Sequence, residues 1–181
     1  MIPRKYLTTG IVLARRNYGE ADRILVVYTK DYGRISLIAK GIRRPTSRKR
    51  GHLEIFNLIK FSAVKGKGLD IMTEVENIDM FPTIRKNLKK VTLAYYFMEV
   101  IGRTTHEHEP HKELYDLIIW YLEKLKTETN LKALRLDFIL RLLTVLGFWP
   151  RNKKMSDPDK ALEEVTERQL SSVRVGKRVL E

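Results

Sequence analysis

The stretch Gly33–Arg50, GRISLIAKGIRRPTSRKR, decides the fold because it joins a predicted strand to a strongly basic loop. Ile35, Leu37 and Ala39 alternate with other residues, as on a strand. Pro45 then disfavours a continuous helix. The loop has no acidic neighbour between Tyr32 and Leu53, and its cations are Lys40, Arg43, Arg44, Arg48, Lys49 and Arg50. Because unpaired charges are costly to bury, the loop must stay in water. It is either a solvated loop of no special use or a site for a polyanion such as nucleic acid, and we favour the second interpretation because Arg and Lys both suit phosphate.

The composition points the same way. The chain has 181 residues, 43% of them hydrophobic, which is enough for a packed core. Its formal net charge is +13 and its pI about 9.9, which favours an anionic partner. The sequence contains no cysteine, which excludes disulfides, cysteine-based zinc sites and a thiol nucleophile. No secretory signal or membrane span is visible, so we expect a soluble cytoplasmic protein without a membrane partner.

The first 80 residues predict five strands. The predicted ranges are Tyr6–Arg16, Arg23–Thr29, Arg34–Ala39, Leu53–Val64 and Leu69–Glu76. Short turns join them, except for the basic loop between the third and fourth. Five strands with a longer third connection match the OB-fold, a small barrel that commonly binds oligonucleotides.

The rest of the chain predicts helices, so the fold class is α+β. Apolar residues at helical spacing run from Ile84 to Ile101, through Leu88 and Tyr95, and a second helix begins at Pro110. A third, from Leu131 to Leu146, is apolar almost all round and is expected to be buried, with an Asn130 cap before it and a Gly147 cap after it. We expect an OB-fold domain at 1–80, a helical domain at 81–150 and a short basic, partly disordered C-terminal segment at 151–181.

Other candidate sites are weaker. The run His106–His111 has three imidazoles and two carboxylates, but its spacing does not match a helical zinc motif, and we favour a polar loop. Glu20, Asp22 and Asp31 are interpreted as partners in structural ion pairs near Arg23 rather than as catalytic acids. Tyr18 and Tyr32, which lie in predicted turns, are candidates for stacking on bases, whereas Tyr28 is expected in the core. No nucleophile–base pair is visible, so we expect neither an enzyme nor a cofactor.

Several short motifs, in order, resemble the RecO family of bacterial recombination mediators. They are Gly19-Glu20-x-Asp22-Arg23, Thr29 with Gly33-Arg34, Ala39-Lys40-Gly41-x-Arg43 and Gly147-Phe148-x-Pro150. The resemblance covers about 150 residues and implies an OB-fold barrel followed by a helical domain. Many family members carry a four-cysteine zinc module after the last motif, and this chain has no cysteine to form one.

The resemblance also implies a function and partners. The protein would bind single- and double-stranded DNA, anneal complementary strands, and help load RecA onto DNA coated with single-strand-binding protein. Its expected partners are RecR and the acidic C-terminal tail of that coating protein, and its expected place is the bacterial cytoplasm, at the nucleoid. The expected nucleic-acid-binding residues are Arg34, Lys40, Arg43, Arg44, Arg48, Lys49, Arg50, Arg85, Lys86, Lys89 and Lys90. Two alternatives remain open: an RNA-binding OB-fold module, and a basic domain that binds acidic peptides.

Overall fold

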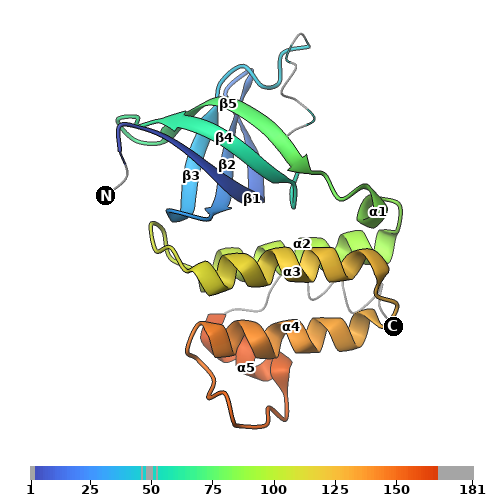
Figure 1. Cartoon of the computed structure of the whole chain (residues 1–181). Coiled ribbons are helices and arrows are strands. Elements are labelled where there is room, and N and C mark those ends of the chain that lie inside the picture. The colour runs from blue at the N-terminus through green and yellow to red at the C-terminus, as the bar shows by residue number, and fades with distance from the viewer. Residues whose placement is uncertain (1–2, 46, 48–50, 52, 167–181) are drawn as a thin grey trace. The chain divides into compact units, whose positions relative to one another are not determined.

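The computed structural model describes residues 3–45, 47, 51 and 53–166. Within them, strands come first and helices follow (Figure 1). The strands are β1 (Lys5–Tyr18), β2 (Asp22–Thr29), β3 (Gly33–Ala39), β4 (Leu58–Val64) and β5 (Asp70–Asp79). The helices are α1 (Pro82–Arg85), α2 (Leu88–Thr104), α3 (Lys112–Thr127), α4 (Leu131–Val145) and α5 (Pro158–Thr166).

The chain divides into two compact units. One contains the strands together with Thr105–His111, and the other contains Phe81–Thr104 and the chain from Lys112 onward. The segment Thr105–His111 therefore lies between two helices in sequence but packs with the barrel.

The strands close into a barrel with the order β1-β2-β3-β5-β4. Strand β3 pairs with β5 in parallel, and the other neighbours are antiparallel. This five-stranded closed barrel confirms the predicted OB-fold, and the helices after it confirm the α+β class. Closure also removes the exposed edges that an open sheet would present to other chains.

Strand β1 closes the barrel because it pairs with β4 in its first half and with β2 in its second. The register shifts between Val12 and Ala14, so Leu13 is the extra residue of a bulge, which bends the strand. Gly10 precedes the bend, and a Cβ there would lie 2.5 Å from the Val27 side chain and 2.9 Å from the Tyr28 carbonyl oxygen. A glycine at this position lets the two backbones approach closely.

The barrel core follows the predicted alternation. Along β3, Ile35, Leu37 and Ala39 are buried, while the residues between them are half-exposed. Strand β2 buries residues on both faces, as its continuous apolar run predicts, and Tyr28 is fully buried.

The fourth predicted strand begins too early. Leu53 and Phe56 are fully buried, but β4 begins only at Leu58. Phe56 has a φ of 60°, in the left-handed region, which interrupts a strand. Its N–H donates to the carbonyl of Val12, and Val12 N–H donates to Asn57. The last part of the long loop is thus fixed to the barrel by two buried side chains and two backbone hydrogen bonds.

The first predicted helix is broken in two. Helix α1 ends at Arg85 and α2 begins at Leu88, where the Asn87 side chain accepts a hydrogen bond from Lys90 N–H. Asn favours helix starts, and here it separates α1 from α2. Leu88 is 74% exposed and Tyr95 38% exposed, although the apolar spacing predicts both on the buried face. The face that α2 buries includes Leu93, Phe97 and Val100.

Helices α3 and α4 follow the prediction more closely, although α3 begins at Lys112 rather than Pro110. Asn130 caps α4 by accepting from Ala133 N–H, and Gly147 after it has a φ of 78°. The core of this unit includes the rings of Phe97, Tyr121 and Phe138, which pack at tilted and edge-on angles with centroids 4.1–5.7 Å apart. Within the described residues α4 is not buried all round, because some of its leucines, including Leu136 and Leu140, are only half-buried.

Candidate nucleic-acid interface

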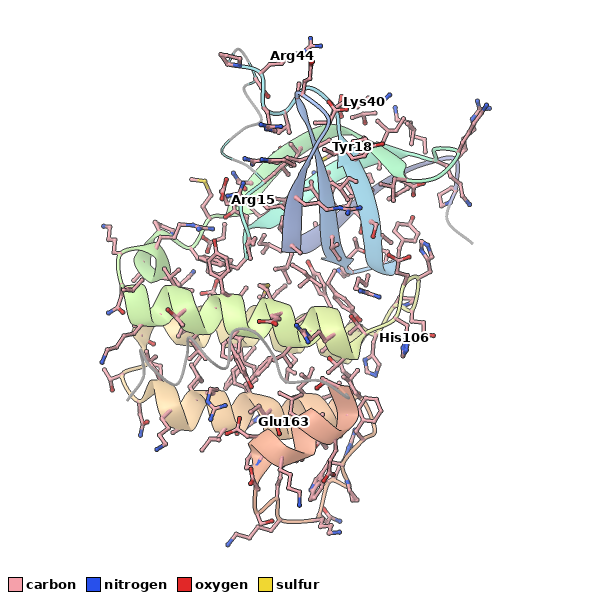
Figure 2. All side chains as sticks on the ribbon, turned by 180° about the vertical axis from the view of Figure 1, so that it is seen from behind. Arg15, Tyr18, Lys40, Arg44, His106 and Glu163 are labelled. Carbon is pink, nitrogen blue, oxygen red and sulfur yellow. The ribbon has the colours of Figure 1, made fainter. Side chains whose placement is uncertain are left out.

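One end of the barrel gathers basic side chains. It lies where β1 ends, β2 begins and β3 ends, because Tyr18 pairs with Asp22 and Arg23 pairs with Ala39. Figure 2 shows Tyr18, Lys40 and Arg44 at this end, with Arg44 on the loop beyond the strands. We call the residues Arg16, Tyr18, Lys40, Arg43 and Arg44 the cationic end.

The first residues of the basic loop are tied to the β1–β2 turn. The carboxylate of Asp22 accepts the Gly41 N–H at 2.7 Å, and the carbonyl of Ala21 accepts the Arg43 N–H at 2.8 Å. Ile42 between them is buried, with 1% of its surface exposed. Gly41 has a φ of 66°, which glycine adopts without strain. The loop therefore leaves the barrel with a fixed backbone, from which the side chains of Lys40, Arg43 and Arg44 extend.

These cations are not neutralised by carboxylates of the described chain. Lys40 and Arg44 are exposed and make no ion pair with any described residue, and Arg43 donates through Nη1 to the carbonyl of Gly19 at 3.2 Å. Two other arginines of the barrel differ: Arg15 lies 2.8 Å from Glu54, and Arg23 lies 3.7 Å from the same carboxylate. Positive charge is thus left available on the loop and is partly compensated beside it.

The predicted acidic partners take different roles. The sequence places Arg23 next to Asp22, but in the structure Arg23 pairs with Glu54, and Asp22 accepts a backbone N–H. Asp31 accepts a hydrogen bond from the hydroxyl of Thr8 at 2.6 Å. Both aspartates therefore accept structural hydrogen bonds instead of forming the predicted ion pairs with described residues, and neither partner could be identified from neighbours in sequence.

Sequence reasoning missed Arg16 as a neighbour of the basic loop. Arg16 pairs with Ile24, which pairs with Ile38 two residues before Lys40. Arg16 and Tyr18 are both exposed and, being two residues apart on one strand, they point to the same side. The arginine pair at 15 and 16 was visible in the sequence, but only the structure shows that Arg15 pairs with Glu54, while Arg16 has no carboxylate partner among the described residues.

The structure does not bring Arg34 to the cationic end. Arg34 is the second residue of β3 and Lys40 follows its last residue, so the strand separates them. Arg34 is half-buried, and its carbonyl accepts the N–H of His108 at 2.9 Å. Arg48, Lys49 and Arg50 lie outside the described residues.

The remaining predicted cations belong to the helical unit. Lys86 and Lys89 are exposed, and Arg85 is in the last turn of α1. Lys90 donates through Nζ to the carbonyl of Lys126 at 2.8 Å, at the C-terminal end of α3. A cation at this position interacts favourably with the helix dipole, so part of the charge of Lys90 already has a structural role.

The histidine-rich segment docks on the barrel. Glu107 accepts a hydrogen bond from the hydroxyl of Ser36 at 2.7 Å, next to the backbone contact of His108 with Arg34. Among the residues the structure describes, no three His, Cys, Asp or Glu side chains are arranged to hold a metal ion. No described helix is long and apolar enough to cross a membrane.

Comparisons with known proteins agree with the fold. Residues 1–81 match the family description Recombination protein O N terminal, and residues 85–164 match Recombination protein O C terminal. The chain is 34% identical over 157 residues to the DNA repair protein RecO of Pelotomaculum thermopropionicum, covering 87% of this chain and 61% of the relative. It is 37% identical over 147 residues to the protein of that name from Rubrobacter xylanophilus, covering 81% of this chain and 59% of the relative.

A third relative, the DNA repair protein RecO of Desulfitobacterium hafniense, is 31% identical over 146 residues, which cover 81% of this chain and 53% of that protein. The chain thus spans between about half and two thirds of the length of these relatives. The two matched regions take in the barrel and the helices in the order that the sequence motifs imply. On these grounds the chain belongs to the RecO family.

Proposed function

We propose that this protein acts in DNA repair as a recombination mediator that binds DNA, anneals complementary strands and helps load RecA onto DNA coated with single-strand-binding protein. The observation that carries the proposal is the cationic end: Lys40, Arg43 and Arg44 extend from one anchored loop without a carboxylate partner in the described chain. Arg48, Lys49 and Arg50 follow them in sequence and are included in the proposed interface.

Annealing in this scheme needs no covalent chemistry. Two complementary strands repel each other through their phosphates, and cations that contact both strands reduce this repulsion. Holding both strands on one surface also raises their local concentration, and the bases then pair unaided. The exposed ring of Tyr18 beside Lys40 offers a surface on which an unpaired base can stack.

The partners proposed with this function are RecR and the C-terminal tail of single-strand-binding protein. The family membership of both matched regions supports them. The cations Arg85, Lys86 and Lys89 of the helical unit are proposed as a further contact for anionic groups of DNA or of an acidic tail.

The DNA interface is tested by the salt dependence of binding. The variant R43Q/R44Q, in the full chain, should bind single-stranded and duplex oligonucleotides more weakly. Its plot of log affinity against log salt should be flatter by about 1.4 to 1.8 log units, because each phosphate contact contributes roughly 0.7 for single strands and 0.9 for duplex. The matched control is K132Q/K160Q, which removes two exposed charges from α4 and α5. Equal slopes for both variants would contradict the proposed interface.

The mediator activity needs its own assay. Complementary strands are annealed by the full chain with and without excess single-strand-binding protein, and the wild-type chain should accelerate pairing in both cases. Competition between DNA and RNA oligonucleotides of one sequence checks the RNA-binding alternative, since tighter binding of RNA would favour it. Peptide binding that survives R43Q/R44Q would favour the acidic-peptide alternative.

A further inference from the structure

The barrel has a pocket at the end opposite the cationic end. At that end Lys5 pairs with Val64, and Thr29 pairs with Gly33. The pocket has a volume of about 710 Å³ and is bounded by the β2–β3 turn, the β4–β5 connection and the segment Thr105–His111. All three boundaries belong to the barrel unit. This volume lies in the range of small-molecule and cofactor sites, which often occupy the mouths of barrels.

An aromatic ring in a fixed position lines this pocket. Tyr32 is half-buried, its N–H donates to the hydroxyl of Thr29 at 3.0 Å, and its ring meets that of Tyr6 edge-on, with centroids 4.9 Å apart. Tyr6 is itself held by a hydrogen bond from its hydroxyl to Asp70 at 2.8 Å. Burial and this carboxylate raise the pKa of Tyr6 well above its usual value, so Tyr6 stays neutral. A ring supported in this way suits stacking on a planar ligand.

Two ammonium groups stand at the edge of the same pocket. Lys65 and Lys67 are exposed, line the pocket, and form no ion pair with any described residue. They flank Gly66 in the β4–β5 connection, whose N–H donates to Asp70. Unpaired cations next to a stacking surface suit a ligand that carries phosphate as well as a ring.

The carboxylates of the pocket already accept hydrogen bonds from the barrel or its neighbours. Asp31 accepts from Thr8, Asp70 from Tyr6, and Glu107 from Ser36. Each carboxylate retains further lone pairs, to which the amino groups of bases can donate hydrogen bonds. Because these charges repel phosphate, a nucleotide would enter with its base inward and its phosphates outward, toward the two lysines.

We propose that this pocket takes one unpaired nucleotide of a single DNA strand, with its base on Tyr32 and its phosphates at Lys65 and Lys67. The proposal rests on the proposed function, since it needs a protein that binds DNA, and it adds a second contact that distinguishes single strands from duplex. A base in a duplex is stacked and paired on both sides, so it cannot reach Tyr32 unless it leaves the helix.

The test compares single-stranded and duplex oligonucleotides of one sequence, bound to the 181-residue chain and followed by fluorescence anisotropy. Tyr32→Leu removes the ring and should lower single-strand affinity roughly 5- to 160-fold, the range of losing one base–aromatic stack. Its effect on duplex affinity should be small. Tyr32→Phe keeps the ring and should stay within about twofold of the wild type for both ligands.

A second variant keeps the test independent of folding. K65Q/K67Q changes only exposed side chains that form no ion pair with a described residue, and it should flatten the salt dependence of single-strand binding by about 1.4 log units. Unchanged single-strand affinity in Tyr32→Leu, or an equal loss for single strand and duplex, overturns the proposal, as does an unchanged salt slope in K65Q/K67Q.

Failure of this proposal is distinguishable from failure of the proposed function. If R43Q/R44Q weakens both ligands while the Tyr32 and lysine variants change nothing, the cationic end binds DNA and the pocket does not. If the pocket variants respond and R43Q/R44Q does not, the pocket binds DNA and the cationic end is excluded. A chain that binds neither oligonucleotide overturns both.

Discussion

Gly33 is a position where one methyl group should strongly disturb the barrel. It begins β3 with a φ of 67°, and a Cβ built on it would lie 2.2 Å from the carbonyl oxygen of Glu109 and 2.4 Å from its carbonyl carbon. Both are backbone atoms, which cannot rotate away as a side chain would. Gly33→Ala must therefore displace the segment Thr105–His111 from the barrel.

The expected cost has two parts. A residue with a Cβ in the left-handed region costs about 1–2 kcal/mol. Displacing the segment breaks the hydrogen bonds from His108 N–H to Arg34 and from Ser36 to Glu107, at about 1 kcal/mol or less each. We expect Gly33→Ala to lower the free energy of unfolding of the barrel by about 2–4 kcal/mol.

Gly19 is the control that isolates the backbone cost from the cost of displacing the segment. It also has a positive φ, 54°, but no atom lies within 4 Å of the place where a Cβ would be. Gly19→Ala should therefore cost only the backbone part. The assay is native-state hydrogen exchange of the full chain, which reports barrel stability separately from that of the helices. The His108 amide should lose protection in Gly33→Ala and keep it in Gly19→Ala. If the two variants cost the same, the close approach at Glu109 does not contribute, and the reasoning is refuted.

Two further predictions concern the loop anchor and alkaline pH. Asp22→Ala and Asp22→Asn remove the same charge, but only Asn keeps an acceptor for Gly41 N–H. Compared with Asp22→Asn, the Ala variant should therefore bind DNA more weakly and be less stable by about 0.5–1.5 kcal/mol. Equal anisotropy titrations and melting curves for the two variants would exclude the anchor. Burial raises the pKa of Tyr28 to about 12, whereas tyrosine ionises near pH 10 in an unfolded chain. The neutral folded form therefore contributes stability that is complete below pH 10 and is lost as the pH rises toward 12, and thermal melts should show a smaller alkaline loss in Tyr28→Phe than in the wild type.

Most of the barrel could be predicted from the sequence, because alternation along single strands such as β3 is a local property. The sequence could not show that the fourth strand begins only at Leu58. Leu53 and Phe56 are buried, as residues of a strand would be, and only the left-handed backbone at Phe56 shows the break. The apolar spacing through Leu88 and Tyr95 predicted a helix correctly, but several apolar residues of α2 compete for the buried face, and packing selects the side with Leu93, Phe97 and Val100.

The candidate site was predictable only in part. The basic loop is continuous in sequence, so Lys40, Arg43 and Arg44 could be named directly, while Arg16 needed the strand register and the pairing of Arg15 with Glu54. The docking of Glu107 on Ser36 joins residues 71 apart, which no local pattern reports. Which of the predicted cations contact DNA, and where the domains are best divided, stay predictions.

Because Thr105–His111 packs with the barrel, the chain cannot be divided into two independent fragments at a single point. The two family regions meet between residues 81 and 85, so a cut there looks natural. Such a cut would strip the barrel of a wall of its pocket and leave Gly33 facing solvent where Glu109 had been. Affinities measured on separated halves should therefore not sum to that of the intact chain, and a fragment that retains the segment would have to be joined to the barrel by an artificial linker.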